Sequence, residues 1–101
     1  MDDTTLGGYQ QVHQRPPAFG GADGQAYSVA PWVDDTPNAD GRYGAALLFV
    51  RWAGAEKPIG HLETDYLAFG STAEAALAPL LALTLREVKD HLDRCVERGR
   101  A

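Results

Sequence analysis

The order of apolar and polar residues along the chain changes character near residue 70. Before that point, apolar and polar side chains tend to alternate at every second position, which is the pattern of a strand with two unlike faces. After it, apolar residues recur every three or four positions, as they do along one side of an amphipathic helix. The chain therefore predicts strands first and helices afterwards, which is typical of an α+β domain.

Three segments have the strand pattern. Residues 26–33 include Pro31, which has no amide proton to donate and therefore favours an edge position or a bulge. Residues 42–52 are rich in aromatic and branched side chains, so this segment is expected to be the central strand. Residues 59–69 again alternate between apolar and polar side chains, and they are expected to form the third strand. The connection at 34–41 consists almost wholly of turn-forming residues and ends in Asp-Gly, which predicts a chain reversal.

Two capping boxes mark the expected helix starts. They are Ser71-x-x-Glu74 and Thr84-x-x-Glu87, in which the hydroxyl and the carboxylate each accept a hydrogen bond from a backbone amide. Pro79 cannot donate to the carbonyl four residues before it, so the first helix is predicted to be short or kinked. The second helix is predicted to bury an apolar stripe made of Leu85, Val88, Leu92, Cys95 and Val96.

These elements predict a three-stranded antiparallel meander followed by a short helix and a longer C-terminal amphipathic helix, over residues 85–98, that packs on one sheet face. A chain of 101 residues has room for one core, so residues 25–101 are expected to form a single domain. Residues 1–24 carry paired glycines and prolines and only scattered apolar side chains, which predicts a flexible N-terminal arm.

The net charge of −5 lies in the first part of the chain. Residues 1–41 contain six aspartates against one arginine, whereas the charges of residues 42–101 balance. This distribution argues against a nucleic-acid partner, which requires clustered basic side chains. No stretch approaches the ~18 apolar residues of a membrane span, and the acidic start does not have the pattern of a secretory signal. Cys95 is the only cysteine, so we expect a buried thiol and a cytoplasmic location.

The sharpest chemical candidate is a group of three polar residues in the third predicted strand. Alternation would place His61, Glu63 and Asp65 on one face, where an imidazole and two carboxylates could bind a metal ion or act as acid and base. A solvated strand face with ion pairs is the commoner use of such residues, and it is the favoured interpretation.

Glu87 and His91 form a second candidate, because they lie one helical turn apart. The capping box already engages Glu87, so an exposed helix face is favoured over a metal site. The sequence contains no glycine-rich phosphate loop, CxxC pair or GxSxG elbow. We therefore expect no cofactor, and an enzymatic role is not favoured.

Two segments resemble those of HicB-type antitoxin domains. Residues 41–45 read Gly-Arg-Tyr-Gly-Ala and residues 70–77 read Gly-Ser-Thr-Ala-Glu-Ala-Ala-Leu. In that family a strand pair leads to a helix start with the pattern Gly-x-Thr-x-Glu-Glu-Ala, and the resemblance implies an antitoxin-type binding role. The Pro-Asp-Leu-Pro-Gly segment of the family does not occur in this sequence.

The favoured function is a small non-enzymatic binding or regulatory domain that also self-associates as a homodimer. It would recognise a protein partner through the uncovered sheet face and the acidic N-terminal half, with a basic partner surface as the best complement. The expected binding residues are Trp32, Asp34, Asp35, Asp40 and Trp52. The alternatives are a small metal-binding protein or hydrolase-type enzyme that uses the His61 group, and an acidic inhibitor protein.

Overall fold

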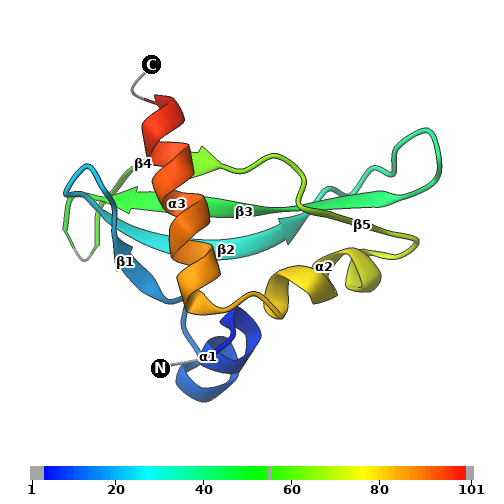
Figure 1. The fold of residues 1–101 in the computed structure, drawn as a ribbon, viewed down its shortest axis with the longest axis horizontal. Coiled ribbons are helices and arrows are strands. Elements are labelled where there is room, and N and C mark those ends of the chain that lie inside the picture. The colour runs from blue at the N-terminus through cyan, green and yellow to red at the C-terminus, as the bar shows by residue number, and fades with distance from the viewer. Residues whose placement is uncertain (1–3, 55, 100–101) are drawn as a thin grey trace.

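The computed structural model describes residues 4–54 and 56–99, and it has an α+β fold in which an antiparallel sheet packs against helices (Figure 1). In chain order the elements are α1 Leu6–His13, β1 Ala18–Gly20, β2 Ala26–Val33, β3 Tyr43–Trp52, β4 Pro58–Glu63, β5 Ala68–Gly70, α2 Ala73–Leu81 and α3 Leu85–Gly99. The predicted α+β class is confirmed. None of the described helices has the length and apolar character that crossing a bilayer requires.

β3 is the central strand, as its composition predicts. The strands run antiparallel in the order β1-β2-β3-β4, and β5 also pairs with β3. β2 pairs with β3 along one edge, so β4 and β5 share the other edge. β1 pairs only with residues 26–28 of β2, so Pro31 lies in the part of β2 that β1 leaves unpaired, in agreement with its expected edge position.

The predicted third strand, residues 59–69, is in fact two strands, and β1 was not predicted, so the sheet has five strands and not three. The chain leaves the ladder between β4 and β5. There the Thr64 hydroxyl accepts a hydrogen bond from the amide of Leu47 at 3.0 Å and donates one to the carbonyl of Asp65 at 2.7 Å. The side chain of Thr64 thus takes a place that a backbone carbonyl fills in a regular ladder, and this interrupts the strand.

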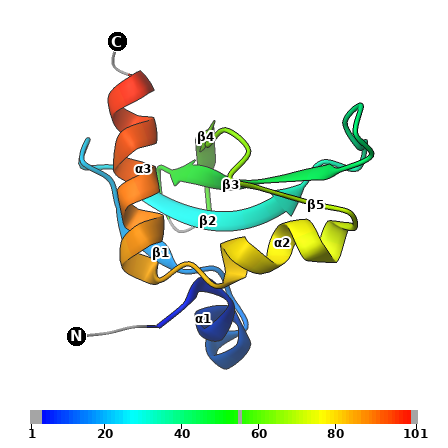
Figure 2. The same cartoon turned by 45° about the vertical axis from the view of Figure 1, so that its right-hand side comes forward.

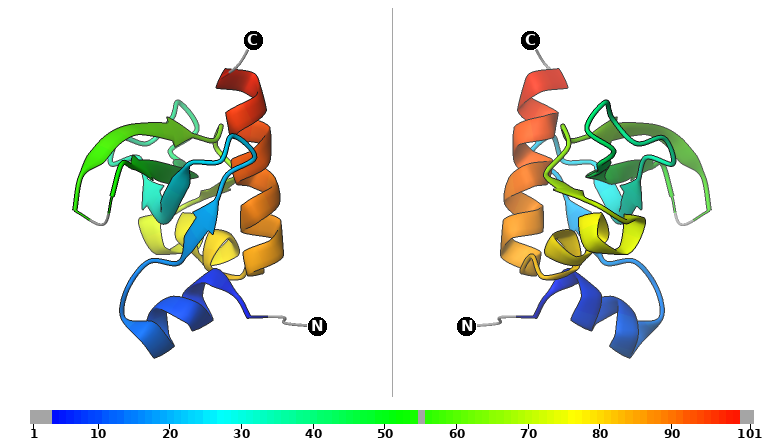
Figure 3. Two further views of the ribbon diagram at one scale, coloured as in Figure 1. Left: turned by 90° about the vertical axis from the view of Figure 1, so that its left-hand side faces the viewer. Right: turned by 90° about the vertical axis from the view of Figure 1, so that its right-hand side faces the viewer.

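The two faces of the sheet have different surroundings. Figures 2 and 3 show α2 and α3 on one side of β2 and β3, with α1 beyond α2. The strand side chains on that side join the helices in one core, which contains Leu6, Tyr27, Val29, Ala45, Leu47, Phe49, Ala76, Leu80, Val88, Leu92, Cys95 and Val96. No described helix covers the opposite side, which we call the open face. α3 packs on this side of the sheet as predicted, although Leu85 of the predicted stripe is only partly buried.

The segment expected to be a flexible arm contains α1 and β1, and residues 1–3 lie outside the described residues. Leu6 is fully buried, and its amide donates to the carbonyl of Leu83 at 2.8 Å. The amide of Leu85 in turn donates to the carbonyl of Thr4 at 2.9 Å. The sequence pattern does not reveal this docking because it depends on one apolar side chain and on backbone hydrogen bonds to a distant segment.

One of the two predicted caps is correct. Thr84 and Glu87 form the expected reciprocal box at the start of α3: the amide of Thr84 donates to Glu87 Oε1 at 2.9 Å, and the amide of Glu87 donates to Thr84 Oγ1 at 3.2 Å. The Ser71 prediction is wrong by one residue, since Thr72 is the N-cap of α2 and accepts from the amide of Ala75 at 3.0 Å. α2 is short, with nine residues and Pro79 inside its second half.

Candidate functional site

The structure keeps two of the three residues of the sharpest predicted site together and separates the third. His61 and Glu63 lie on β4 opposite Val50 and Leu48, and their side chains approach to 3.6 Å. Asp65 lies in the break after β4 and pairs with Arg98 of α3 at 3.5 Å. Because the break interrupts the alternation, the predicted common face does not form. Within residues 4–54 and 56–99, no group of three His, Cys, Asp or Glu side chains is placed to hold a metal ion.

Glu87 and His91 do not join that group. Thr84 engages Glu87, as predicted, and its amide and hydroxyl lower the pKa of the Glu87 carboxyl. His91 lies on α3, on the helix-covered side of the sheet, whereas His61 lies on the open face beside a shallow hollow of about 360 Å³. The two histidines therefore face different surfaces of the molecule.

Three aromatic side chains gather at one end of the open face. Tyr66 stacks edge-on against Trp32, with ring centroids 6.2 Å apart, and against Phe69, with centroids 5.7 Å apart. Tyr66 and Phe69 remain 43% and 48% exposed. Gly44 of β3 makes the arrangement possible, because a Cβ atom there would lie only 2.8 Å from the Tyr66 ring. These rings come from β2, β5 and the break between β4 and β5.

Carboxylates flank this aromatic group. The Tyr66 hydroxyl donates to Asp34 Oδ2 at 2.5 Å, and this hydrogen bond lowers the pKa of Asp34 and raises that of Tyr66. The charge of Glu63 also contributes to the raised pKa of Tyr66, so Glu63 lies within electrostatic range of the ring. We name Trp32, Asp34, Glu63, Tyr66 and Phe69 the aromatic-acidic surface.

The other predicted binding residues have different surroundings. Asp35 follows Asp34 in the loop after β2, while Asp40 is exposed in the turn that leads back to β3. Trp52 lies at the opposite end of β3 from Gly44, and its indole N–H donates to Ser28 Oγ at 2.9 Å. By contrast, the indole N–H of Trp32 is buried and has no partner among the described residues. An unpaired buried donor is uncommon in a folded protein.

Sequence reasoning missed Tyr66 as a member of this surface. Strict alternation from His61 placed Tyr66 on the face opposite Phe69, but the break after Thr64 brings both rings to the open face. A weak signal was present in the sequence, because the polar residues 63–65 separate the strand pattern before them from the apolar and aromatic run of residues 66–69. Its effect on the direction of Tyr66 depends on the contact with Gly44.

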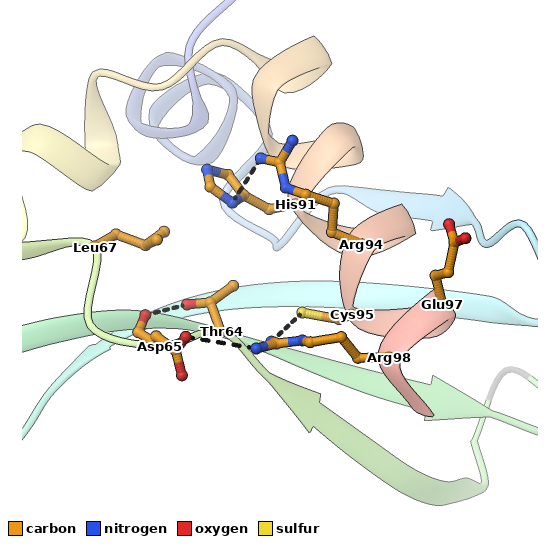
Figure 4. A pocket seen from close by; sticks show the side chains of 8 residues that line it. All are labelled: Thr64, Asp65, Leu67, His91, Arg94, Cys95, Glu97 and Arg98. Atoms are coloured by element: carbon orange, nitrogen blue, oxygen red, sulfur yellow. Dashed lines mark hydrogen bonds and ion pairs between the residues drawn. The ribbon is translucent and has the colours of Figure 1, made fainter. Parts of the chain in front are cut away.

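A larger hollow, of about 600 Å³, lies between the C-terminal half of α3 and the break after β4 (Figure 4). We call it the α3 hollow. Its lining residues are Thr64, Asp65, Leu67, His91, Arg94, Cys95, Glu97 and Arg98. The predicted burial of Cys95 is confirmed, since this residue is 4% exposed.

Arg98 joins the two walls of the α3 hollow. Its guanidinium donates to the carbonyl of Glu63 at 3.3 Å, lies 3.5 Å from Asp65 Oδ2 and contacts Cys95 Sγ at 3.6 Å. The contact with Cys95 and the charge of Asp65 raise the pKa of Arg98 further above its already high value. Arg98 therefore holds the end of α3 against the break in the sheet.

No family model, curated protein or solved structure matches this chain.

Proposed function

We propose that this protein is a binding domain that docks a basic, extended segment of a partner protein on the aromatic-acidic surface. The single observation that carries the proposal is the exposed pair Tyr66 and Phe69 beside the carboxylate of Asp34. A lysine or arginine side chain lies favourably over an aromatic face, and the contribution is about 0.5–1 kcal/mol at an exposed site. A carboxylate next to the ring adds Coulomb attraction and directional hydrogen bonds.

The charge distribution supports a basic occupant over an acidic or neutral one. Four ion pairs are present among the described residues, and none of them uses Asp34 or Asp35. Asp34 and Asp35 therefore have no ion-pair partner among the described residues, whereas Glu63 of the same surface lies 3.6 Å from His61. The net charge of −5 acts in the same direction, because it attracts cationic segments and repels a second copy of the same face.

Packing at the surface also supports docking. The buried indole N–H of Trp32 has no acceptor among the described residues, and the neighbouring Tyr66 ring is half-exposed. This surface therefore has a hydrogen-bonding group that its own described residues do not satisfy.

The test uses the full chain and a short arginine-rich peptide that also carries leucine. NMR titration should shift the Trp32 indole and Tyr66 ring signals in a saturable way, whereas the same peptide with glutamate in place of arginine should bind far more weakly. Tyr66→Ala should weaken binding about fivefold, the equivalent of ~1 kcal/mol. Tyr9→Ala is the matched control, because Tyr9 lies on α1 and stacks on His13.

Two results would overturn the proposal. The first is equal affinity of the arginine and glutamate peptides, or equal affinity of the Tyr66→Ala and Tyr9→Ala variants. The second is a solution mass of two chains that returns to one chain in Tyr66→Ala, because a second copy would then occupy the aromatic-acidic surface.

A further inference from the structure

The α3 hollow is large enough for a small molecule, and of its two arginines one is paired with a carboxylate of the described residues and the other is not. Its volume of about 600 Å³ falls within the ~300–1,000 Å³ typical of ligand sites. Arg94 and Arg98 lie one helical turn apart and both line the hollow, with the Arg94 guanidinium beside His91 and the Arg98 guanidinium beside Asp65 (Figure 4). Leu67 provides an apolar wall opposite the helix, as Figure 4 shows.

The two arginines differ in their partners. Arg98 is engaged by Asp65 and by the Glu63 carbonyl. The contact of Arg94 is with His91 Nδ1, at 3.2 Å, and no carboxylate of the described residues pairs with it. Because arginine can only donate, Nδ1 of His91 must accept, which leaves the proton of the neutral ring on Nε2.

Charged groups of both signs surround His91. Burial and then the charge of Arg94 lower the pKa of His91, against the opposite effects of Asp90 and Glu87 on the same helix. From the facing wall, Asp65 is committed to Arg98. The remaining carboxylate of the lining, Glu97, points away from Leu67 and Thr64 in Figure 4.

We propose that the α3 hollow binds a small organic anion, a carboxylate with an apolar body, whose charged end contacts Arg94 beside His91 and whose apolar part contacts Leu67. A guanidinium and a carboxylate form a charge-assisted and often bidentate pair. The Nε2–H of neutral His91 is a further donor for the same ligand. This site lies on the helix-covered side of the sheet, so it is independent of the aromatic-acidic surface.

Octanoate is a suitable probe, and octanamide is its neutral counterpart. In NMR titrations of the full chain, octanoate should shift the imidazole signals of His91 in a saturable way, and octanamide should bind about tenfold more weakly or worse. Bound octanoate should also raise the pKa of His91, since a nearby anion favours the charged imidazole.

Arg94→Gln tests the cation that the proposal uses. Its exposed side chain makes the substitution compatible with folding, and saturation of the His91 signals at fixed pH should require about tenfold more octanoate. Arg86→Gln is the matched control, because Arg86 is exposed on the same helix and does not line the hollow.

Three outcomes would overturn the site. They are the absence of saturable shifts at His91, equal affinities for octanoate and octanamide, and equal losses in Arg94→Gln and Arg86→Gln. Octanoate that shifts only the Trp32 and Tyr66 signals would also overturn it, because the open face would then be the binding surface. None of these results depends on whether the arginine-rich peptide binds.

Discussion

The two faces of the sheet treat their polar groups differently. On the helix-covered face the hydroxyl of buried Tyr27 donates to Asp23 Oδ2 at 2.7 Å and accepts from Arg51 Nε at 2.8 Å. On the open face the Tyr66 hydroxyl meets only Asp34, and the Trp32 indole N–H has no partner among the described residues. The Tyr27 hydroxyl thus has a donor and an acceptor, whereas the Trp32 indole N–H has no acceptor among the described residues.

This difference suggests separate roles for the two faces: the covered face stabilises the fold, and the open face is the one proposed to bind a partner. The Tyr27 network closes the edge of the core, where Arg51 also lies 5.4 Å from the centre of the Tyr27 ring, so both hydrogen bonds and a cation–π contact hold the same residues. The aromatic-acidic surface has exposed rings and a carboxylate without an ion-pair partner. We therefore expect substitutions on the covered face to change the free energy of unfolding, and substitutions on the open face to change binding.

The largest expected change in the free energy of unfolding is that of Phe49→Ala, and its neighbour Leu48, which points to the opposite face, provides the comparison. Phe49 is fully buried among the helices, whereas Leu48 is only partly buried. Phe49→Ala should lower the free energy of unfolding by about 3–5 kcal/mol, because the surrounding core cannot close the cavity. Leu48→Ala should cost roughly 1 kcal/mol. Urea denaturation measures both losses. Similar values would contradict the claim that side chains on the covered face stabilise the fold more than those on the open face.

An intermediate effect is expected for Asp23→Asn, which removes the charge from the Tyr27 network. At neutral pH the loss in free energy of unfolding should be about 1.5–3 kcal/mol, the range for a hydrogen bond to a charged group. Asp40→Asn, in the exposed turn, is the control and should change the free energy of unfolding by less than about 0.5 kcal/mol.

The pH dependence of the same variant provides a second measurement. Burial raises the pKa of Asp23, but hydrogen bonds from Tyr27 and the Gln25 amide, together with the charge of Arg51, lower it by more. A folded-state pKa below the ordinary value of 3.8 means that the stabilisation is complete above that value and is lost as the pH falls through the folded pKa. The gap between wild type and Asp23→Asn should therefore narrow on acidification below about pH 4. A difference in free energy of unfolding that does not change with pH would contradict a stabilising role for the Asp23 carboxylate.

The smallest expected effect is that of Tyr66→Phe, which leaves the ring over Gly44 and removes its hydroxyl. The pKa of Asp34 should rise toward its ordinary value, because the hydroxyl hydrogen bond is the main cause of its lowered pKa. NMR titration of the Asp34 carboxyl measures this change. An unaltered pKa would mean that the Thr36 amide, the second cause, maintains the shift alone.

Local signals in the sequence were sufficient for several elements. The strand at 26–33 was predicted with its observed bounds, and the strand at 42–52 begins one residue later than expected. The reciprocal box of Thr84 and Glu87 marks the start of α3 as predicted. Alternation, helical spacing and capping depend on neighbouring residues, so they can be recognised without knowledge of the fold.

The candidate surfaces were less accessible to sequence reasoning. Trp32 and Asp34 were predicted binding residues and lie in the aromatic-acidic surface, but Tyr66 and Phe69 were not among them. The α3 hollow was not predicted at all, since Asp65 and Arg98 are 33 positions apart and are joined only by the packing of α3 on the sheet. Homodimerisation stays a prediction, and the solution mass described above would test it.

By itself the sequence determined the α+β class, the central strand and the final helix, because each depends on periodicity within a single segment. Only the tertiary structure decided that Thr64 divides a strand, that Leu6 enters the core and that Tyr66 turns over Gly44. Each of these outcomes depends on a partner distant in sequence, whose hydrogen bonds and apolar contacts exist only once the chain is folded. The sum of these tertiary contacts, and not the local conformational preference of each segment, determines which side chains are buried and which remain exposed.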